Sequence, residues 1–402
     1  MAMIVQKYGG SSVADAERVR NVARRITDTY KAGNDVVVIL SAQGDTTDDL
    51  IEKAREINPD ASKREMDMLL SNGEQISIAL CAMAIEALGF PVISLAGWQI
   101  GMHTDSDYGN ARITRVDGSR LRAELDRKNI VLVAGFQGIN KFDDVTTLGR
   151  GGSDTTAVAV ATALNADVCQ IYTDVDGVYT ADPRIVKNAK KLDEITYDEM
   201  LELATLGAQV LHNRSVEMAK RYHITLEVLS SLENRPGTKV KEVVNMEAMK
   251  VSGVARDNNA ARISLTNLPD VPGMAFKLFS LLSHEKINVD IILQSIGRGS
   301  NKDISFTVAQ TALQQARDVL EHHRESLGYE EMIVRDDVAK LSIVGSGMVN
   351  NPGVAASMFE ALYRAGVNIQ MISTSEIKVS VLIDRAMCDK AVQAVHEQFF
   401  GA

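Results

Sequence analysis

Glycine-rich turns beside charged residues are the features of this sequence best suited to chemistry. A short apolar strand predicted over 3–5 runs on into Lys7 to Ser12 (KYGGSS), and an amphipathic helix is predicted over 14–30. Two glycines let backbone N–H groups approach phosphate oxygens, and the lysine adds a full positive charge. Ser12 to Asp15 has the pattern of a capping box for the helix. A Gly-Gly turn is also a common plain connection, so both interpretations stay open here.

A second glycine-rich segment, Gly149 to Thr156 (GRGGSDTT), leads into a small-residue helix predicted over 153–164. Arg150 and Asp154 lie four residues apart across this turn. A guanidinium fork and a carboxylate in one pocket can bind an anionic group and orient an ammonium or a lysine. An Arg–Asp surface pair is the alternative, but two intervening glycines are costly unless something must approach the backbone.

A third segment, Thr173 to Arg184 (TDVDGVYTADPR), follows a buried strand predicted over 168–172. It places three carboxylates at the carboxyl end of that strand, with a tyrosine ring and an arginine beside them. Carboxylates there suit Mg²⁺ and nucleotide hydroxyls, and the arginine suits a phosphate. Asp-Gly and Asp-Pro are also ordinary turn chemistry, so some of these aspartates are expected to be structural.

Ser41 to Thr47 follow the strand predicted over 36–40, and Glu74 comes just before a helix predicted over 75–88. Hydroxyls and a carboxylate at such ends could bind a small zwitterion, with Glu74 taking the amino group. Read alone, Glu74 is a favourable first-turn acid. None of the 7 histidines lies in these segments, which disfavours serine–histidine catalysis. A carboxylate acceptor needs cations rather than a histidine base, and the P-loop and protein-kinase motifs are absent.

Alternating strands and helices must position these residues. Strands are predicted over 3–5, 36–40, 91–95, 130–134, 168–172 and 224–229, and helices over 14–30, 75–88, 153–164 and 215–222. This alternation predicts a mainly parallel sheet covered by helices on both faces, with ligands beyond the carboxyl ends of its strands.

An internal repeat occupies the last third of the chain. The segments that begin at Pro272 and Pro352 share Pro, Gly, Ala, Phe, Leu, Asn, Ile and Ser in register at a period of 80. Each copy reads as strand, Pro-Gly turn, helix, Asn-containing turn and strand, which is half of a small α+β module. A purely structural duplication and a paired sensor are equally compatible with this pattern.

Composition restricts the class of protein. The chain has 402 residues, 45% hydrophobic and 24% charged, with a net charge of −10, so a folded protein of two or three domains is expected. The acidic balance argues against broad binding of nucleic acid or anionic membranes. Cys81, Cys169 and Cys388 form no paired motif, which indicates a cytoplasmic protein. The apolar stretch 76–85 ends at Glu86, so no membrane span or targeting segment is expected.

Together, KYGGSS, SNGEQIS, GRGGSDTTA and TDVDGVYTADPR, in this order and followed by the repeat, resemble the aspartate kinases of the amino acid kinase fold. The resemblance implies a three-layer α/β/α catalytic domain over 1–245 and two α+β ACT (ferredoxin-like) modules over 250–338 and 339–402. It also implies ATP- and Mg²⁺-dependent phosphorylation of the L-aspartate side chain, the first step toward lysine, threonine and methionine.

The resemblance implies roles residue by residue. Catalysis is expected from Lys7 and Asp154, and substrate binding from Ser41, Thr47, Glu74, Arg150, Gly151, Gly152 and Ser153. ATP contacts are expected from Lys7, Tyr8, Gly9, Gly10, Ser41, Thr173, Asp174, Tyr179, Asp182 and Arg184. A second phosphate-binding lysine is expected at Lys239 or Lys241. Two departures from the family pattern, Gln43 and Tyr8, remove no charged group, and no metal-ligand set is predicted.

The ACT modules are expected to bind lysine, threonine or both. The implied effector residues are Asp270, Met274, Ala275, Asn288, Val289, Asp290, Gln294, Asn368, Ile369, Ser375 and Glu376. A homo-oligomer is expected, and an internal start at Met246 or Met249 would give a short regulatory subunit. Two other functions stay open: an inactive amino-acid sensor, and a kinase for another carboxylate such as glutamate or acetylglutamate.

Overall fold

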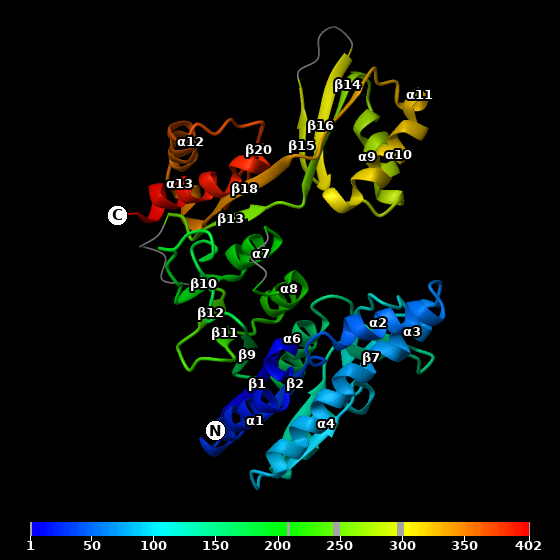
Figure 1. Cartoon of the computed structure of the whole chain (residues 1–402), viewed down its shortest axis with the longest axis vertical. Helices are drawn as coiled ribbons and strands as arrows, with labels where there is room; N and C mark the ends of the chain where they lie inside the picture. Colours follow the sequence, from blue (N-terminus) through cyan, green and yellow to red (C-terminus); the bar gives the residue numbers. More distant parts are fainter. Residues whose placement is uncertain (1, 207–209, 244–249, 296–300, 402) are drawn as a thin grey trace. The chain divides into compact units, whose positions relative to one another are not determined.

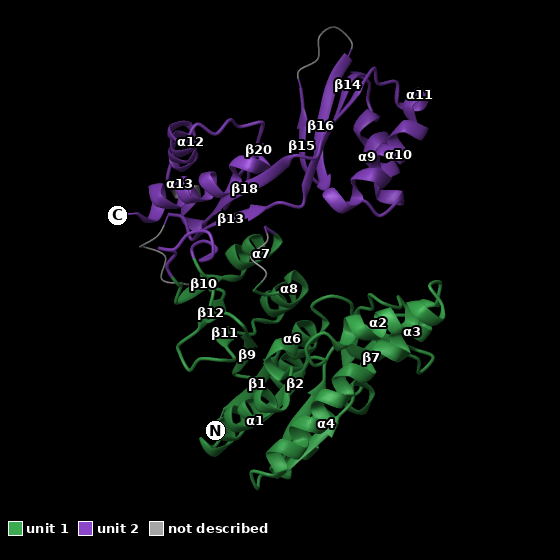
Figure 2. Ribbon diagram, viewed as in Figure 1, with its two compact units in different colours: residues 1–179, 191–205, 209–245 green, residues 180–190, 206–208, 246–402 purple. Residues whose placement is uncertain are grey.

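Two compact units make up the structure, a computed structural model that describes residues 2–206, 210–243, 250–295 and 301–401. Unit 1 comprises residues 1–179, 191–205 and 209–245, and unit 2 comprises residues 180–190, 206–208 and 246–402 (Figure 2). The proposed internal starts at Met246 and Met249 lie outside the described residues.

A large sheet forms the centre of unit 1 (Figure 1). Eight of the described strands join it in the order β10-β12-β11-β9-β1-β2-β6-β3, and every neighbouring pair is parallel except β11 with β12. Its strands are β1 (Met3–Tyr8), β2 (Asp35–Leu40), β3 (Val92–Leu95), β6 (Ile130–Ala134), β9 (Val168–Thr173), β10 (Glu194–Thr196), β11 (Leu226–Ser230) and β12 (Thr238–Lys241). The predicted parallel sheet is confirmed.

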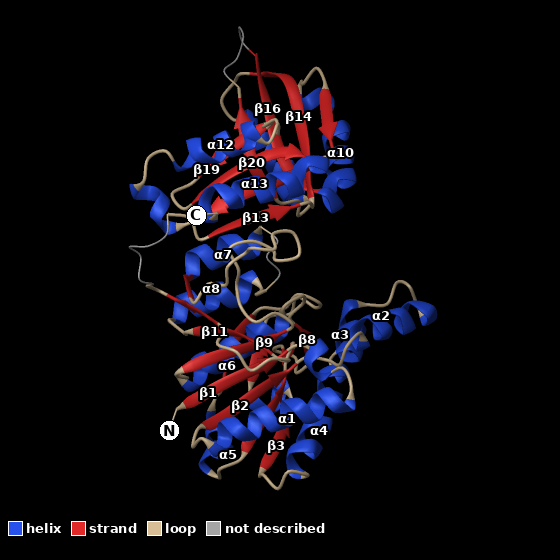
Figure 3. Ribbon diagram, turned by 60° about the vertical axis from the view of Figure 1, so that its left-hand side comes forward, coloured by secondary structure: helices blue, strands red, loops and turns tan. Residues whose placement is uncertain are grey.

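Helices surround this sheet and a smaller one. The helices of unit 1 are α1 (Ala16–Lys31), α2 (Thr46–Ile57), α3 (Lys63–Leu70), α4 (Asn72–Glu86), α5 (Ser119–Asp126), α6 (Gly152–Leu164), α7 (Tyr197–Thr205) and α8 (Asn213–Tyr222). The smaller sheet has the order β5-β4-β7-β8, from β4 (Met102–Thr104), β5 (Ile113–Val116), β7 (Gln137–Ile139) and β8 (Val145–Thr147). Figure 3 shows the large sheet with helices packed along it.

Both faces of the large sheet are buried. Val36, Val38 and Leu40 of β2 pack in one apolar cluster with side chains of α1 and α4. Because successive side chains of a strand point to opposite faces, Val37 and Ile39 face the other side, where α6 contacts β1, β2 and β9. Continuous apolar strands are typical of a parallel sheet covered twice, so the predicted α/β/α layering is confirmed.

The start of α1 differs from the prediction. The residues after Gly9 form a 3₁₀ turn, Gly10–Val13, and α1 begins only at Ala16. Asp15 is the capping residue, and its carboxylate accepts from the backbone N–H of Arg18 at 2.9 Å. The predicted capping box from Ser12 is therefore wrong. Aspartate caps as well as serine does, so a second acceptor three residues on displaced the first candidate.

Unit 2 contains two four-stranded sheets among its described residues, with the orders β13-β18-β20-β19 and β15-β16-β14-β17. The strands are β13 (Gly253–Asp257), β14 (Ala260–Pro269), β15 (Val289–Gln294), β16 (Asn301–Ala309), β17 (Met332–Arg335), β18 (Val338–Val344), β19 (Met371–Thr374) and β20 (Lys378–Asp384). The helices are α9 (Met274–His284), α10 (Leu313–His322), α11 (Arg324–Leu327), α12 (Val354–Arg364) and α13 (Cys388–Phe400). The predicted duplication is confirmed: Gly273 and Gly353, at φ +89° and +97°, precede α9 and α12 in the same way.

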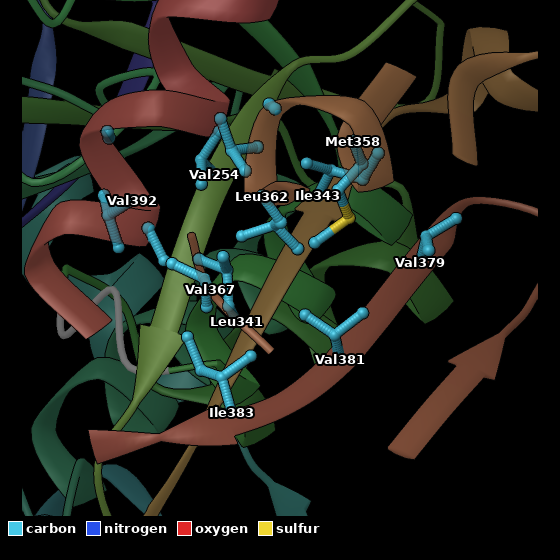
Figure 4. Packing of buried hydrophobic residues seen from close by; sticks show 14 of the residues in the cluster. Val254, Leu341, Ile343, Met358, Leu362, Val367, Val379, Val381, Ile383 and Val392 are labelled. Atoms are coloured by element: carbon cyan, nitrogen blue, oxygen red, sulfur yellow. The ribbon is translucent and has the colours of Figure 1, made fainter. Parts of the chain in front are cut away.

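The sheets of unit 2 do not follow the predicted sequential boundaries. Strand β13 lies within 250–338, the range expected for the first module, yet it pairs antiparallel with β18 of the second. The second module's core also includes Ala181 and Val186, from a segment expected to belong to the kinase domain. Figure 4 shows this core around Leu341, Val381 and Val392. Boundaries at 245 and 338 therefore misassign two segments that the packing gives to the second module.

One stretch among the described residues, Lys63–Glu86, is long and apolar enough to cross a membrane by length and composition alone. It consists of α3 and α4, which are separate helices in the structure. Ile78, Cys81 and Ile85 of α4 belong to the core cluster of the large sheet. Packing against the sheet therefore explains these three apolar residues, whereas Ile76 and Met83 of the same helix are exposed.

Candidate active site

A cleft of about 290 Å³ lies in unit 1, where β1, β2 and β6 end and α6 begins. Carboxyl ends of parallel strands meet at one edge of a sheet, so segments far apart in sequence converge there. The lining residues are Lys7, Gly9, Gly10, Ser41, Ala42, Gly44, Thr47, Glu74, Phe136, Gly149, Arg150, Gly151, Gly152, Ser153 and Asp154. The structure thus brings together every predicted substrate-binding residue and both predicted catalytic residues.

An ion pair between Lys7 and Asp154 lines this cleft. Lys7 Nζ lies 2.6 Å from Asp154 Oδ1, and each side chain is 12% exposed. A Cβ atom at Gly9 would lie 3.6 Å from the same Nζ, so the ammonium sits beside the double-glycine turn. Asp154 thus holds the Lys7 ammonium beside the double-glycine turn. This is an arrangement suited to phosphate oxygens.

The second glycine turn is shaped by close contacts. Gly151 has a φ of +71°, and a Cβ there would lie 2.2 Å from Cγ of His212. A Cβ at Gly152 would lie 2.8 Å from the ring of Phe136. Since any side chain would collide, the two glycines let the start of α6 approach its neighbours. Burial lowers the pKa of His212, which keeps its ring neutral at pH 7.

Neither His212 nor Phe136 was among the predicted site residues. His212 caps α8 and follows Gly151 by some sixty positions, outside any pattern of charge or glycine. Phe136 has a positive φ of 69° just after β6, a conformation that nothing in the local sequence predicts. Only the tertiary structure reveals that Phe136 lines the cleft and that His212 packs against Gly151.

The loop before Arg150 is anchored from two sides. The buried carboxylate of Asp67 accepts from the backbone N–H and the hydroxyl of Thr147, at 2.9 and 2.7 Å. Arg214 donates to the carbonyl oxygen of Leu148 at 2.6 Å. These contacts fix the residues just before the turn, while the Arg150 side chain is exposed at the cleft.

Glu74 brings an unusual carboxyl group to the cleft. It lies in the first turn of α4 and is 3% exposed. Oε1 accepts from the backbone N–H of Ala42 at 3.2 Å, and Oε2 has no hydrogen-bond partner among the described residues. Burial raises the pKa of Glu74 to about 7. A buried oxygen that faces a cleft without a partner is available to a ligand's donor.

The predicted role of Tyr8 needs a correction. Tyr8 is fully buried, and its ring stacks on Tyr172 with centroids 4.4 Å apart, so its side chain lies in the core and not in the cleft. Alternation along β1 causes this, because Lys7 points to the cleft and its neighbour must point away. Gln43, the other departure from the family pattern, donates to the carbonyl oxygen of Val13 at 2.6 Å.

The segment after β9 belongs to unit 1 up to Tyr179 and to unit 2 from Thr180. In unit 1, Thr173 donates to Asp174 at 3.0 Å. Tyr179 donates to Asp176 at 2.7 Å, and Lys191 lies 3.4 Å from the same carboxylate, so Asp176 has a structural role. These contacts support the expectation that some aspartates here serve the turn.

The remainder of that segment lies in unit 2. Asp182 and Arg184 pair with each other at 2.8 Å, and the Arg184 side chain is 88% exposed. Lys239 and Lys241 are on β12 in unit 1. Lys241 pairs with Glu194 at 2.6 Å, and neither lysine lines the cleft.

The predicted effector residues lie in the two modules of unit 2. Asp270 pairs with the almost buried Lys302 at 2.9 Å, and Asp290 pairs with the almost buried Lys340. Met274 is buried at the start of α9. Both aspartates of the expected effector set are therefore already paired with lysines of unit 2.

Ala275 lies in the first turn of α9. The other predicted effector residues lie at strand ends and in loops: Asn288, Val289, Gln294, Asn368, Ile369, Ser375 and Glu376. Most of their side chains are exposed, whereas Ile369 packs against the core of the second module. Glu376 lies in the turn before β20, where the backbone N–H of Ser375 donates to the carbonyl oxygen of Lys378 at 2.8 Å.

No cluster of three or more potential metal ligands occurs among the described residues. Mg²⁺ that accompanies a nucleotide usually keeps phosphate and water ligands and takes one or two carboxylates. Asp154, in the cleft, and Asp174, at the end of β9, are carboxylates of that kind.

Family models and curated relatives assign this chain to the same family. A model described as the amino acid kinase family matches residues 2–230, and an ACT domain model matches residues 263–323 and 341–399. The chain is 53% identical to an aspartokinase of Mycolicibacterium smegmatis over 405 residues, covering 99% of this chain and 96% of that protein. It is 50% identical to an aspartokinase of Bacillus sp. (strain MGA3), covering 99% and 97%.

Two solved structures of an aspartokinase support the same family. E. coli aspartokinase III, in complex with aspartate and ADP (R-state), is 26% identical and aligns with a TM-score of 0.82 over 99% of this chain and 100% of that one. Its complex with lysine and aspartate (T-state) aligns with a TM-score of 0.78 at 27% identity, over 99% of each chain. The chain therefore belongs to the amino acid kinase family and, within it, to the aspartokinases, the ATP-dependent kinases of aspartate.

Proposed function

We propose that this chain transfers the γ-phosphoryl group of ATP to the side-chain carboxylate of L-aspartate. The observation that carries the proposal is the cleft of unit 1. It presents the Lys7–Asp154 pair at a double-glycine turn, together with the cation of Arg150 and the buried carboxyl group of Glu74. One side suits phosphate, and the opposite charges of Arg150 and Glu74 suit an amino acid zwitterion.

Each residue then has a defined task. Arg150 binds the α-carboxylate of aspartate with its planar fork, and the free Oε2 of Glu74 accepts from the α-ammonium. Ser41 and Thr47, which also line the cleft, contribute hydroxyl groups to the substrate. A substrate held by both charged groups on its α-carbon leaves its side-chain carboxylate free to extend toward Lys7.

A side-chain carboxylate oxygen of aspartate forms the new bond to the γ-phosphorus, and the bond between that phosphorus and the β,γ-bridging oxygen breaks, so that ADP leaves. Catalysis of this transfer consists mainly of positioning and of offsetting negative charge. Lys7, held by Asp154, supplies the charge beside the double-glycine turn. Mg²⁺ bound with ATP supplies further positive charge, with Asp154 and Asp174 as candidate ligands.

The nucleotide is proposed to contact the segment from Thr173 to Arg184. This part of the proposal rests on the motif and on family membership, because Asp182 and Arg184 belong to unit 2. The ACT modules are proposed to bind lysine, threonine or both, at the residues that the family resemblance implies. E. coli aspartokinase III has been solved with lysine, which supports lysine as the first effector to test.

A coupled ADP-release assay of the full chain tests this function. ATP with L-aspartate should give turnover, whereas L-glutamate and acetylglutamate should not. Lys7→Ala should reduce kcat at least a hundredfold, because one preorganised charge at the transferring group is lost. Lys31→Ala removes a lysine that is 55% exposed and does not line the cleft, and it should leave turnover unchanged.

Two outcomes would reject the proposal. ATP binding without turnover would identify an inactive sensor, and turnover with another acid would identify a different carboxylate kinase. Repeating the assay with lysine, threonine and both tests the modules separately, since an active enzyme that ignores both amino acids would reject only the effector proposal. We also propose a cytoplasmic homo-oligomer that binds neither nucleic acid nor membrane, with a short subunit from the internal start; gel filtration and mass measurement test the assembly.

A further inference from the structure

The segment 180–190 is built into the second module of unit 2, although it follows strand β9 of unit 1 in the sequence. Ala181 and Val186 are 4% and 3% exposed and belong to the module's apolar cluster. The same cluster contains Leu341 and Val392, which Figure 4 labels. Buried apolar side chains make the conformation of this segment depend on the folding of the module.

Polar contacts tie the same segment to α13. Gln393 donates to the carbonyl oxygen of Ile185 at 3.1 Å, and Lys190 donates to that of Phe400 at 3.2 Å. At the other side of the segment, the backbone N–H of Val254 donates to the carbonyl oxygen of Thr180 at 2.7 Å. The segment is therefore held along its length by the helix and by β13.

His396 is the most buried of these partners. It is fully buried on α13, with Nε2 at 2.9 Å from Oγ1 of Thr180, which is itself 1% exposed. The same hydroxyl accepts from the backbone N–H of Lys190 at 2.9 Å. The imidazole stacks on Phe400 with centroids 4.7 Å apart. Burial lowers the pKa of His396, so the neutral ring makes this hydrogen bond at pH 7.

We propose that His396 is a positioning residue for ATP binding, acting through Thr180. Thr180 follows Tyr179 directly and precedes Asp182 by two positions, so fixing its hydroxyl fixes the backbone between two expected nucleotide contacts. The inference rests on the proposed function of that segment. It assigns to the second ACT module a constant role in holding the nucleotide loop, in addition to any effector binding.

Two variants remove the hydrogen bond with little change of shape: His396→Phe keeps a ring for stacking, and Thr180→Val replaces the hydroxyl by a methyl group. Two others retain a polar partner: His396→Gln and Thr180→Ser. Steady-state kinetics of the full chain should give a KM for ATP about fivefold higher in His396→Phe, the size of one lost hydrogen bond, and at least as high in Thr180→Val, which also loses the bond from the Lys190 N–H. We expect kcat and the KM for aspartate to change less than twofold, and the second pair to resemble the wild type.

Ser342→Ala is the matched control. It removes one hydroxyl of the buried Ser342–Ser380 pair in the same module, 2.7 Å apart. An equal rise of the KM for ATP in this control, or no rise in Thr180→Val, would overturn the inference while leaving an active wild type and hence the proposed function intact. An inactive wild type would instead reject the proposed function, and equilibrium binding of ATP would then decide the inference by the same fivefold criterion.

Limited trypsin cleavage gives a readout independent of activity and of the stability of His396→Phe. Arg184 and Lys187 are exposed in this segment. Cleavage after them, mapped by mass spectrometry, should be faster in Thr180→Val than in Thr180→Ser or Ser342→Ala. Equal rates in all three would show that the hydroxyl does not hold the segment, which would also overturn the inference.

Discussion

Replacement of Glu74 by glutamine is the perturbation that tests the cleft most directly. Glutamine has the same shape and can still accept from the backbone N–H of Ala42, but it carries no charge. Burial raises the pKa of Glu74 to about 7, so near neutral pH the free enzyme contains both protonation states of this carboxyl group. The α-ammonium of aspartate is proposed to bind the ionised state.

The size of the effect follows from that pKa. With a pKa of about 7, about a tenth of Glu74 is ionised at pH 6 and about nine tenths at pH 8. If only the ionised state binds aspartate well, affinity should rise about tenfold from pH 6 to pH 8. At pH 7 binding should also release about half a proton, because half of the carboxyl groups must lose theirs.

Isothermal titration calorimetry with L-aspartate at pH 6, 7 and 8 measures the affinity, and buffers of different ionisation enthalpy measure the released proton. Glu74→Gln should bind more weakly at pH 8, with no proton release and a flat pH profile. The reasoning is refuted if the wild type is equally flat, or if the variant keeps the tenfold slope. His212, whose pKa is lowered by burial, does not titrate in the upper half of this range.

The raised pKa of Glu74 also makes the stability of the folded protein depend on pH. The folded-state pKa of Glu74 lies above its ordinary value of 4.5, so the protonated form favours the folded protein. The corresponding stabilisation is complete below pH 4.5 and is lost as pH rises through about 7. Because the side chain is 3% exposed, the full conversion of 1.36 kcal/mol per unit applies, and the loss amounts to about 3 kcal/mol. Thermal unfolding of Glu74→Gln at pH 5 and pH 8 should reveal it as a larger gain in stability at pH 8.

Three further variants test the rest of the structure. Asp154→Asn removes the charge that holds Lys7 at 2.6 Å and should lower kcat about a hundredfold, measured by ADP release; near-normal turnover would remove Asp154 from the mechanism. Gly151→Ala places a Cβ 2.2 Å from Cγ of His212 at a φ of +71°, so the KM for aspartate should rise at least tenfold, and an unchanged KM would mean that this turn does not shape the substrate site. Leu341→Ala, in the fully buried core of the second module, should reduce the free energy of unfolding by about 3 kcal/mol in a denaturant titration; a loss below about 1 kcal/mol would contradict the assigned core.

Much of the fold could be read from local pattern. The apolar runs around Val36 and Ile130 became neighbouring strands, because a parallel sheet covered on both faces requires continuous apolar strands. The repeat at Pro272 and Pro352 was visible because each copy needs the same turn before its helix. The boundaries of the modules were not visible, since β13 pairs with a strand some eighty residues later and nothing local marks that choice.

The sequence by itself determined the kinds of chemistry available: a lysine at a double-glycine turn, an arginine and an aspartate four residues apart, and an acid at the start of a helix. Residue type and spacing carry this information because charge and backbone freedom are local properties. Only the tertiary structure decided that Asp154 pairs with Lys7, that burial raises the pKa of Glu74 to about 7, and that His212 packs directly against Gly151. Burial and long-range contact depend on which elements pack together, and that is a property of the whole fold.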